Sequence, residues 1–273
     1  LIEYLDNSIK DQAEVEQRLS LPTLGAITRV ADHNTKAEKV TLSDPRSHFA
    51  EGYRMLYANL RYSLPASAGW RVFLVSSAGP SEGKTTIATN LAIVTAQAGQ
   101  KVILVDCDLR RPSLNRVWGC SNEVGLTSLL VGDVSSLDAV LQHTDVPGLR
   151  LLPSGPMSRN APELLASPRM SELLGELSQQ ADVTILDTAP LLAVADASIL
   201  AALVTGTLLV VRLGHTRMDA CGQAVDVVRK AGGRVLGVVV NGQAARRGGY
   251  YYHYYGDGSR GDGHKRKTGR RRT

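Results

Sequence analysis

Ala78-Gly79-Pro80-Ser81-Glu82-Gly83-Lys84-Thr85 follows the apolar run Val72-Phe73-Leu74-Val75 and opens a helical pattern that extends to Ala98. A strand, a glycine-rich turn and a helix in this order form a phosphate loop, in which backbone N–H groups point at phosphate oxygens. Ala78 stands where this loop usually has glycine, and a negative φ there would make the change harmless. The residues predicted to bind a nucleotide are Gly79, Ser81, Glu82, Gly83, Lys84, Thr85 and Thr86.

Three aspartates follow two further apolar runs. Val102–Val105 leads into Asp106-Cys107-Asp108, and Val183–Leu186 leads into Asp187. The carboxyl ends of parallel strands meet at one edge of a sheet, so these side chains should lie beside the phosphate loop. Carboxylates there can hold Mg²⁺ through water or accept a proton from a nucleophile. The spacing alone does not divide these roles among the three residues.

Similar apolar runs recur at Leu149–Leu152, Leu208–Val211 and Val235–Val240. Helical patterns lie between them, including Pro168–Gln180 and Asp219–Ala231, and another at His48–Tyr62 precedes the first run. Strands that alternate with helices predict an α/β fold, a doubly wound, mostly parallel sheet of the P-loop NTPase type. Residues 1–20 read as an amphipathic helical linker, and residues 31–46 as a loop.

Composition limits the setting of the chain. Hydrophobic residues make up 43% and charged residues 21% of the 273 residues, which is ordinary for a globular protein. Three cysteines without C-x-x-C spacing argue against a disulfide framework or a zinc site, and favour a reducing compartment. No run of about 18 apolar residues predicts a membrane span.

The last 28 residues differ in composition from the rest. Residues 246–273 hold nine Lys/Arg against two Asp/Glu, so the net charge of +5 belongs to this segment. They contain almost no aliphatic side chains, which predicts a disordered tail. The tail carries a cluster of accessible tyrosines: Tyr250, Tyr251, Tyr252, Tyr254 and Tyr255.

Taken together, the phosphate loop, Asp106-x-Asp108-x-Arg110 and the strand ending in Asp187-x-x-Pro190 resemble the bacterial tyrosine kinases of capsular and exopolysaccharide synthesis. The resemblance covers nearly the whole chain, including Asn160–Leu165 and Val210–Thr216. Chromosome-partitioning and septum-positioning ATPases share this core but carry a signature lysine where this chain has Gly79, which favours the kinases.

The resemblance implies an ATP- and Mg²⁺-dependent tyrosine autokinase that regulates exopolysaccharide or capsule polymerisation and export. Lys84 would hold the phosphates, Asp106 would be the base, and Asp108 and Asp187 would position Mg²⁺ with Thr85. Asn241 sits where relatives contact adenine, and Arg110 is a candidate for transition-state stabilisation. The tail tyrosines would be the phosphate acceptors, modified in a neighbouring copy.

The resemblance also implies a setting and partners. Residues 1–45 would be a juxtamembrane linker, residues 46–245 the kinase domain and residues 246–273 the tail. The chain would work in the cytoplasm at the inner face of the plasma membrane, with a membrane-embedded chain-length-determinant modulator fused upstream. The family's oligomerisation helix resembles Glu-x-x-Arg-x-x-Arg. Here Glu51 and Arg54 match, but the third position is Tyr57, which supplies no guanidinium, so ring assembly would be weaker or would use Arg61 instead.

Two alternatives stay open from the sequence. One is a non-kinase ATPase switch that positions cargo, with the tail as a passive tether. The other is an ATPase whose basic tail binds nucleic acid, with a steep dependence on salt. The tyrosine cluster favours the kinase over both, so no nucleic-acid partner is expected.

Overall fold

A computed structural model describes residues 7–30, 37–64 and 71–244 of the chain. The chain divides into two compact units, Leu1–Gln243 and Ala244–Thr273. The predicted tail and all five of its tyrosines lie outside the described residues. The fold below is that of the first unit.

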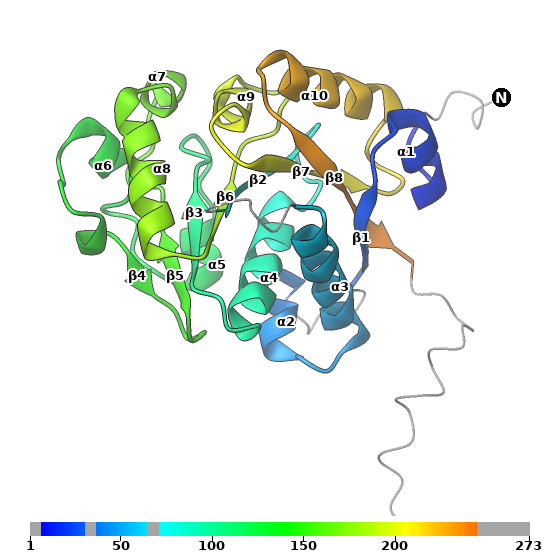
Figure 1. Cartoon of the computed structure of the whole chain (residues 1–273), viewed down its shortest axis with the longest axis horizontal. Coiled ribbons are helices and arrows are strands. Elements are labelled where there is room, and N and C mark those ends of the chain that lie inside the picture. Colours follow the sequence, from blue (N-terminus) through cyan, green and yellow to red (C-terminus); the bar gives the residue numbers. More distant parts are fainter. Residues whose placement is uncertain (1–6, 31–36, 65–70, 245–273) are drawn as a thin grey trace, which may run out of the picture. The chain divides into compact units, whose positions relative to one another are not determined.

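The described strands form one sheet, which crosses the middle of the first unit (Figure 1). They are β1 (Thr23–Thr28), β2 (Arg71–Ser77), β3 (Val102–Asp106), β4 (Gln142–His143), β5 (Leu149–Leu152), β6 (Val183–Asp187), β7 (Gly206–Arg212) and β8 (Val235–Gln243). Their order is β1-β8-β7-β2-β6-β3-β5-β4. Every neighbouring pair is parallel except β4 with β5. The prediction of a mostly parallel sheet is confirmed.

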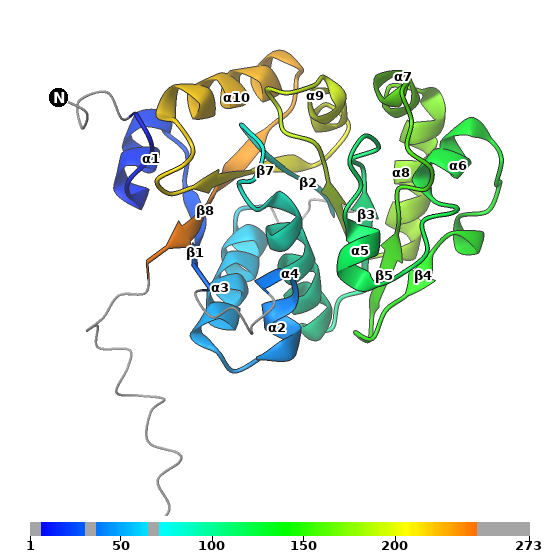
Figure 2. The ribbon, with the colours of Figure 1, turned by 180° about the vertical axis from the view of Figure 1, so that it is seen from behind.

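Helices cover both faces of this sheet, as the two opposite views show (Figures 1 and 2). The α-helices are α1 (Gln12–Leu19), α2 (Val40–Ser43), α3 (His48–Tyr62), α4 (Lys84–Gln97), α5 (Leu114–Trp118), α6 (Leu126–Val131), α7 (Ala161–Leu165), α8 (Pro168–Gln180), α9 (Asp196–Ala201) and α10 (Met218–Lys230). Short 3-10 turns lie at Ala37–Lys39 and Leu137–Ala139.

Two apolar clusters, one on each face of the sheet, hold the helices against it. Successive side chains of a strand point to opposite faces, so a strand can contribute to both clusters. In β2, Val72 and Leu74 join a cluster that includes buried residues of α8, α9 and α10. Phe73 and Val75, on the opposite face of the same strand, join a cluster with α3 and α4. This is the doubly wound arrangement that the apolar runs predicted, with the strands buried on both faces.

The N-terminal region differs from its expected form. Helix α1 covers only Gln12–Leu19, while Ser8 forms an antiparallel bridge with Arg217. Residues 23–28 form β1, which extends the sheet beside β8. Residues 37–43, expected as part of a loop, form a 3-10 turn and α2. Asn90 of α4 holds this stretch, because its amide accepts from the Thr41 N–H at 3.0 Å and donates to two carbonyls before it.

The three cysteines, Cys107, Cys120 and Cys221, are free in the structure. Among the described residues, no helix combines the length and the apolar character needed to cross a bilayer.

Candidate active site

The phosphate loop connects β2 to α4 at the carboxyl edge of the sheet. Two of its residues have positive φ, Ser81 at 61° and Gly83 at 99°, whereas Ala78 does not. The condition set out from the sequence is therefore met, and alanine can replace glycine at position 78 without backbone strain. Gly83 caps α4, so the N–H groups of the first helical turn face the loop. A Cβ on Gly83 would overlap the amide nitrogen of Asn241, which explains the need for glycine there.

The first turn of α4 brings Lys84 and Thr85 to the strand ends. The Thr85 hydroxyl donates to Asp187 Oδ2 at 2.6 Å and lies 3.2 Å from the Ser113 hydroxyl. The other carboxylate oxygen of Asp187 is buried and has no hydrogen-bond partner among the described residues. A buried, unsatisfied acceptor beside a hydroxyl is the kind of site that a cation or a bound water completes.

Asp106 and Asp108 lie in the loop that follows β3. Both carboxylate oxygens of Asp106 accept from backbone: one from Asp108 at 3.2 Å, the other from Ser113 and Leu114 at 2.9 Å each. Asp106 therefore fixes the loop that carries Asp108. The side chain of Asp108 is half-buried and accepts from the Arg111 N–H at 3.0 Å.

Asp106 and Asp187 are register partners in β3 and β6, and both side chains are buried. Burial is the main cause that raises the pKa of each carboxyl group. For Asp187 the neighbouring Asp106 raises the pKa further, while Thr85 and Lys84 oppose the rise. For Asp106 the three backbone N–H groups oppose it. Two adjacent buried acids with raised pKa values mark a site suited to a cation or to proton transfer.

A cavity of about 510 Å³ opens beside the loop. Its lining includes Ser81, Gly83 and Thr86 from the loop and helix, and Asn241 at the end of β8. The apolar side chains of Ile27, Val30, Val40 and Phe49 form another part of the wall. The volume lies in the range of small-ligand sites, and the polar loop beside an apolar wall suits phosphates and a base.

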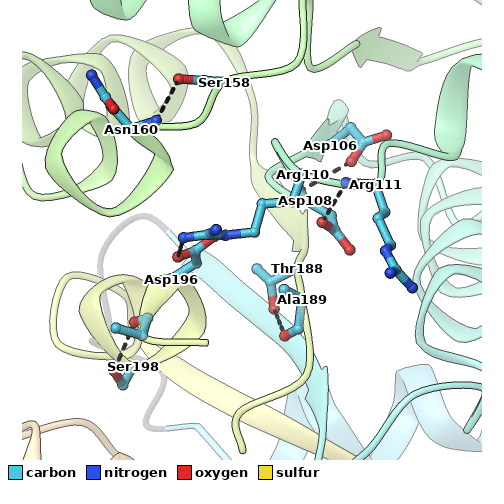
Figure 3. Close-up of polar contacts among 11 residues, drawn as sticks. Asp106, Asp108, Arg110, Arg111, Ser158, Asn160, Thr188, Ala189, Asp196 and Ser198 are labelled. Atoms are coloured by element: carbon cyan, nitrogen blue, oxygen red, sulfur yellow. Dashed lines mark hydrogen bonds and ion pairs between the residues drawn. The ribbon is translucent and has the colours of Figure 1, made fainter. Parts of the chain in front are cut away.

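Arg110, in the loop that carries Asp106 and Asp108, forms an ion pair with Asp196. Its guanidinium donates from Nε to Asp196 Oδ2 at 2.8 Å and from Nη2 to Oδ1 at 3.2 Å. Figure 3 shows the Arg110 side chain extending from the Asp108 loop to Asp196, whereas Arg111 points away. Asp196 is fully buried at the start of α9, and Arg110 is about one-third exposed. The pair therefore ties α9 to the loop of acids and leaves part of the guanidinium open to solvent.

The structure brings most of the predicted site residues together at one edge of the sheet. Lys84, Thr85, Asp106, Asp108 and Asp187 surround the start of α4, while Ser81, Gly83, Thr86 and Asn241 line the cavity. Gly79 and Glu82 lie inside the loop and bind one another, the Gly79 N–H donating to Glu82 Oε1 at 3.3 Å. Glu51 and Arg54 lie elsewhere, on the exposed side of α3.

Sequence reasoning missed three residues of the site. Ser113 and Leu114 hold Asp106 through backbone N–H groups, for which a sequence gives no signal. Asp196 binds Arg110, and its only sequence signal is an acid at the start of a short helical pattern.

A phosphate loop at a helix N-terminus, with a threonine hydroxyl and buried aspartates at neighbouring strand ends, defines a P-loop nucleotide-binding protein. The AAA domain family matches residues 74–231. The chain is 37% identical over 204 residues to the tyrosine-protein kinase YwqD of Bacillus subtilis, covering 75% of this chain and 85% of that protein. The chain belongs to the bacterial tyrosine-protein kinases, and the predicted family is confirmed.

Other relatives agree in fold and differ in length. The solved kinase domain of the Escherichia coli tyrosine kinase ETK superposes with a TM-score of 0.78 at 28% identity, over 88% of this chain and 99% of that one. The tyrosine-protein kinase ptk of Acinetobacter johnsonii is 31% identical over 86% of this chain, which spans only 33% of ptk. The septum site-determining protein MinD of Pyrococcus horikoshii, complexed with Mg-ADP, has a TM-score of 0.54 at 25% identity, over 63% of this chain and 70% of that one.

Proposed function

We propose that this chain transfers the γ-phosphoryl group of ATP to tyrosines in the C-terminal tail of a neighbouring copy. The observation that carries the proposal is the meeting of the phosphate loop with two buried carboxylates, Asp106 and Asp187, at adjacent strand ends. The acceptors would be Tyr250, Tyr251, Tyr252, Tyr254 and Tyr255.

The loop and the first turn of α4 would bind the triphosphate. Backbone N–H groups of the loop would contribute partial positive charge, and the Lys84 ammonium would hold the β- and γ-phosphates. Nucleotide binding would also involve Gly79, Ser81, Glu82, Gly83, Thr86 and Asn241. Gly83 and Asn241 support this assignment because both line the cavity beside the loop.

The residues present fit a magnesium ion. Asp187 has a buried oxygen without a partner among the described residues, and the Thr85 hydroxyl lies 2.6 Å from its other oxygen. Thr85 would bind Mg²⁺ directly, while Asp187 and Asp108 would hold it through its waters. The ion would supply charge neutralisation between the β- and γ-phosphates. The Mg-ADP complex of the related MinD supports a nucleotide–magnesium pair here.

Asp106 would act as the base. The tyrosine oxygen would attack the γ-phosphorus, the bond to the β-phosphate bridging oxygen would break, and the phenolic proton would pass to the Asp106 carboxylate. Burial raises the pKa of Asp106, which brings its basicity closer to what proton abstraction near neutral pH requires. Its three backbone hydrogen bonds would keep the carboxylate in place during the transfer.

The wider setting follows from the family. We propose that copies of the chain associate through the face of α3 that carries Glu51 and Arg54, which brings one tail to another copy's site. A membrane-embedded modulator, joined upstream, would place the kinase at the cytoplasmic face of the membrane. Each phosphate would add a charge of about −1.5 to −2 and so offset the positive charge of the tail. This cycle of phosphorylation would regulate capsule or exopolysaccharide synthesis.

The test is incubation of the full chain with Mg²⁺ and γ-labelled ATP, followed by phosphosite mapping. We expect label on the tail tyrosines, and none in a Lys84→Met variant. Lys230→Met, an exposed change at the end of α10, serves as the matched control and should label like the wild type. Hydrolysis of ATP without label on protein, with or without added membrane modulator, would contradict the proposal and favour a positioning switch.

A further inference from the structure

Three consecutive carbonyl groups of the phosphate loop are hydrogen-bonded to side chains from the last two strands and the turn between β7 and α10. The bonds run from His215 Nε2 to the Pro80 carbonyl at 3.4 Å, from Arg212 Nη1 to the Ser81 carbonyl at 3.0 Å, and from Asn241 Nδ2 to the Glu82 carbonyl at 2.9 Å. We call Arg212, His215 and Asn241 the brace. All three brace residues also line the cavity of about 510 Å³.

The brace determines where the loop's N–H groups point. In a planar trans peptide the carbonyl of one residue and the N–H of the next point in opposite directions. Carbonyls turned toward the brace therefore turn the N–H groups of Ser81, Glu82 and Gly83 to the other side of the loop. Such successive N–H groups form the anion-binding concavity of a phosphate loop.

The backbone of the loop needs this support. Ser81 has a φ of 61°, a left-handed conformation that non-glycine residues rarely adopt. The bond from Arg212 holds the carbonyl of this same residue, so it stabilises the unusual conformation directly. Asn241 packs against Gly83, where no side chain would fit. The disfavoured torsion and the brace thus occur at the same peptide groups.

The turn that carries two of the brace residues is itself fixed. The N–H of Arg212 donates to the Thr216 hydroxyl at 2.8 Å. Ile9 exchanges backbone bonds with this turn, donating to the Thr216 carbonyl at 2.8 Å and accepting from the Gly214 N–H at 2.9 Å. Because the turn is held on both sides, it can impose a conformation on the loop.

We propose that Arg212 and His215 are positioning residues, which act with Asn241 to keep the loop's N–H groups ready for the phosphates of the nucleotide. The proposal rests on the proposed nucleotide-dependent function of the same loop. It assigns Arg212 and His215 to phosphate affinity and gives these two residues no contact with the base or the ribose, whereas Asn241 also lies where relatives contact adenine. Loss of Arg212 or His215 should therefore weaken the binding of a phosphate-bearing ligand and leave the binding of a ligand without phosphate unchanged.

The test compares MgADP with adenosine, which has no phosphate, by calorimetric titration of the full chain. For Arg212→Ala we expect the Kd for MgADP to rise about tenfold, since one charge-assisted hydrogen bond is lost. The Kd for adenosine should change by less than about twofold. Arg212→Lys keeps a donor and should restore part of the affinity. His215→Ala should show a smaller loss, because its bond is longer and exposed.

The matched control is Arg229→Ala, an exposed arginine in the last turn of α10, which should bind both ligands like the wild type. Melting temperatures of the ligand-free variants check folding, and exposed His215 provides a second variant if Arg212→Ala unfolds. If Arg212→Ala and His215→Ala both bind MgADP with wild-type affinity, the positioning role of the brace is wrong, while the proposed function still stands. Equal losses for adenosine and MgADP would also overturn the positioning role, since they indicate direct contact with the nucleoside. A wild-type chain that binds no MgADP would overturn the proposed function, and the brace with it.

Discussion

Asp106 and Asp187 are direct neighbours across β3 and β6, and both carboxyl groups are buried at the edge of the sheet. Burial raises the pKa of both carboxyl groups, and the nearby Asp106 raises the pKa of Asp187 further, so the pair works against stability in the absence of a cation. The Thr85 hydroxyl satisfies one oxygen of Asp187 but leaves the other without a partner among the described residues. The arrangement is understandable if the site is built for a bound cation.

The first prediction concerns Asp187→Asn. Removing one buried charge should raise the free energy of unfolding of the ligand-free chain by about 1–2 kcal/mol, because the amide still accepts from Thr85. The same change should abolish tyrosine phosphorylation, since it removes a proposed magnesium contact. Urea denaturation and labelling with γ-labelled ATP measure the two effects. A variant that is less stable than the wild type would contradict the unfavourable pairing of the two acids.

The second prediction is a dependence of stability on pH and magnesium. The pKa values of Asp106 and Asp187 are raised in the folded chain. Below pH 4, about the ordinary pKa of aspartate, the two carboxyl groups are therefore protonated in the folded and in the unfolded chain. Above about pH 4 the unfolded chain releases these protons before the folded chain does. The contribution of the two carboxyl groups to stability is therefore lost as the pH rises through their pKa values in the folded chain. Magnesium should offset that loss, so it should raise the melting temperature more at pH 8 than at pH 5.5.

Other ionisable groups also contribute to the pH profile, and Asp187→Asn isolates the pair. The difference in melting temperature between this variant and the wild type should grow from pH 5 to pH 8 without magnesium. A constant difference across this range would count against the assignment.

The third prediction separates the Arg110–Asp196 pair from the acids beside it. Arg110→Ala leaves the Asp196 carboxylate buried without its bidentate partner, which should cost about 2 kcal/mol; the exposed third of Arg110 reduces the usual penalty. Arg110→Ala combined with Asp196→Ala should recover part of that loss, because no buried charge is left unpaired. Urea denaturation of the two single variants and the double variant measures the coupling. Strict additivity would show that the ion pair does not link α9 to the loop.

Long apolar runs made most of the fold predictable. The expected strand at 183–186 and the expected helices at 48–62 and 168–180 agree with β6, α3 and α8 to within a residue. Strand β1 was not predicted because Thr23–Thr28 is short and only partly buried, and its partner β8 is more than 200 residues away. Glycine suits position 25 of β1 because a Cβ there would lie 2.9 Å from the Cβ of Leu56 on α3. The local sequence gives no sign of this contact.

The site was predictable in its residue types and less so in its connections. The strand ends and the glycine-rich turn indicated where Lys84, Asp106 and Asp187 would meet. The sequence did not indicate that Asp106 binds three backbone N–H groups, because those come from the fold of the following loop. It also did not pair Arg110 with Asp196, since 86 residues separate them and either charge alone looks like a solvated side chain.

The last prediction concerns assembly through α3. Tyr57, which replaces the family's third charged position, is half-buried and packs against the apolar cluster under the helix, so it does not present a charge to a partner. Arg61 is exposed and lies seven residues, or two turns, after Arg54, on the same side of α3. Met55 and Tyr62 of the same helix expose 57% and 84% of their surface, so α3 also offers apolar side chains that a second copy could cover.

We expect Arg54→Glu and Arg61→Glu each to shift the chain from oligomer to monomer in size-exclusion chromatography with light scattering. Tail phosphorylation should then become strongly dependent on protein concentration, because transfer between copies requires an encounter. Arg229→Glu, the same charge reversal on α10, should leave both the mass and the labelling rate unchanged. If Arg54→Glu acts and Arg61→Glu does not, Arg61 does not replace the missing arginine. If neither variant changes the mass of an oligomeric wild type, the copies associate through a different surface.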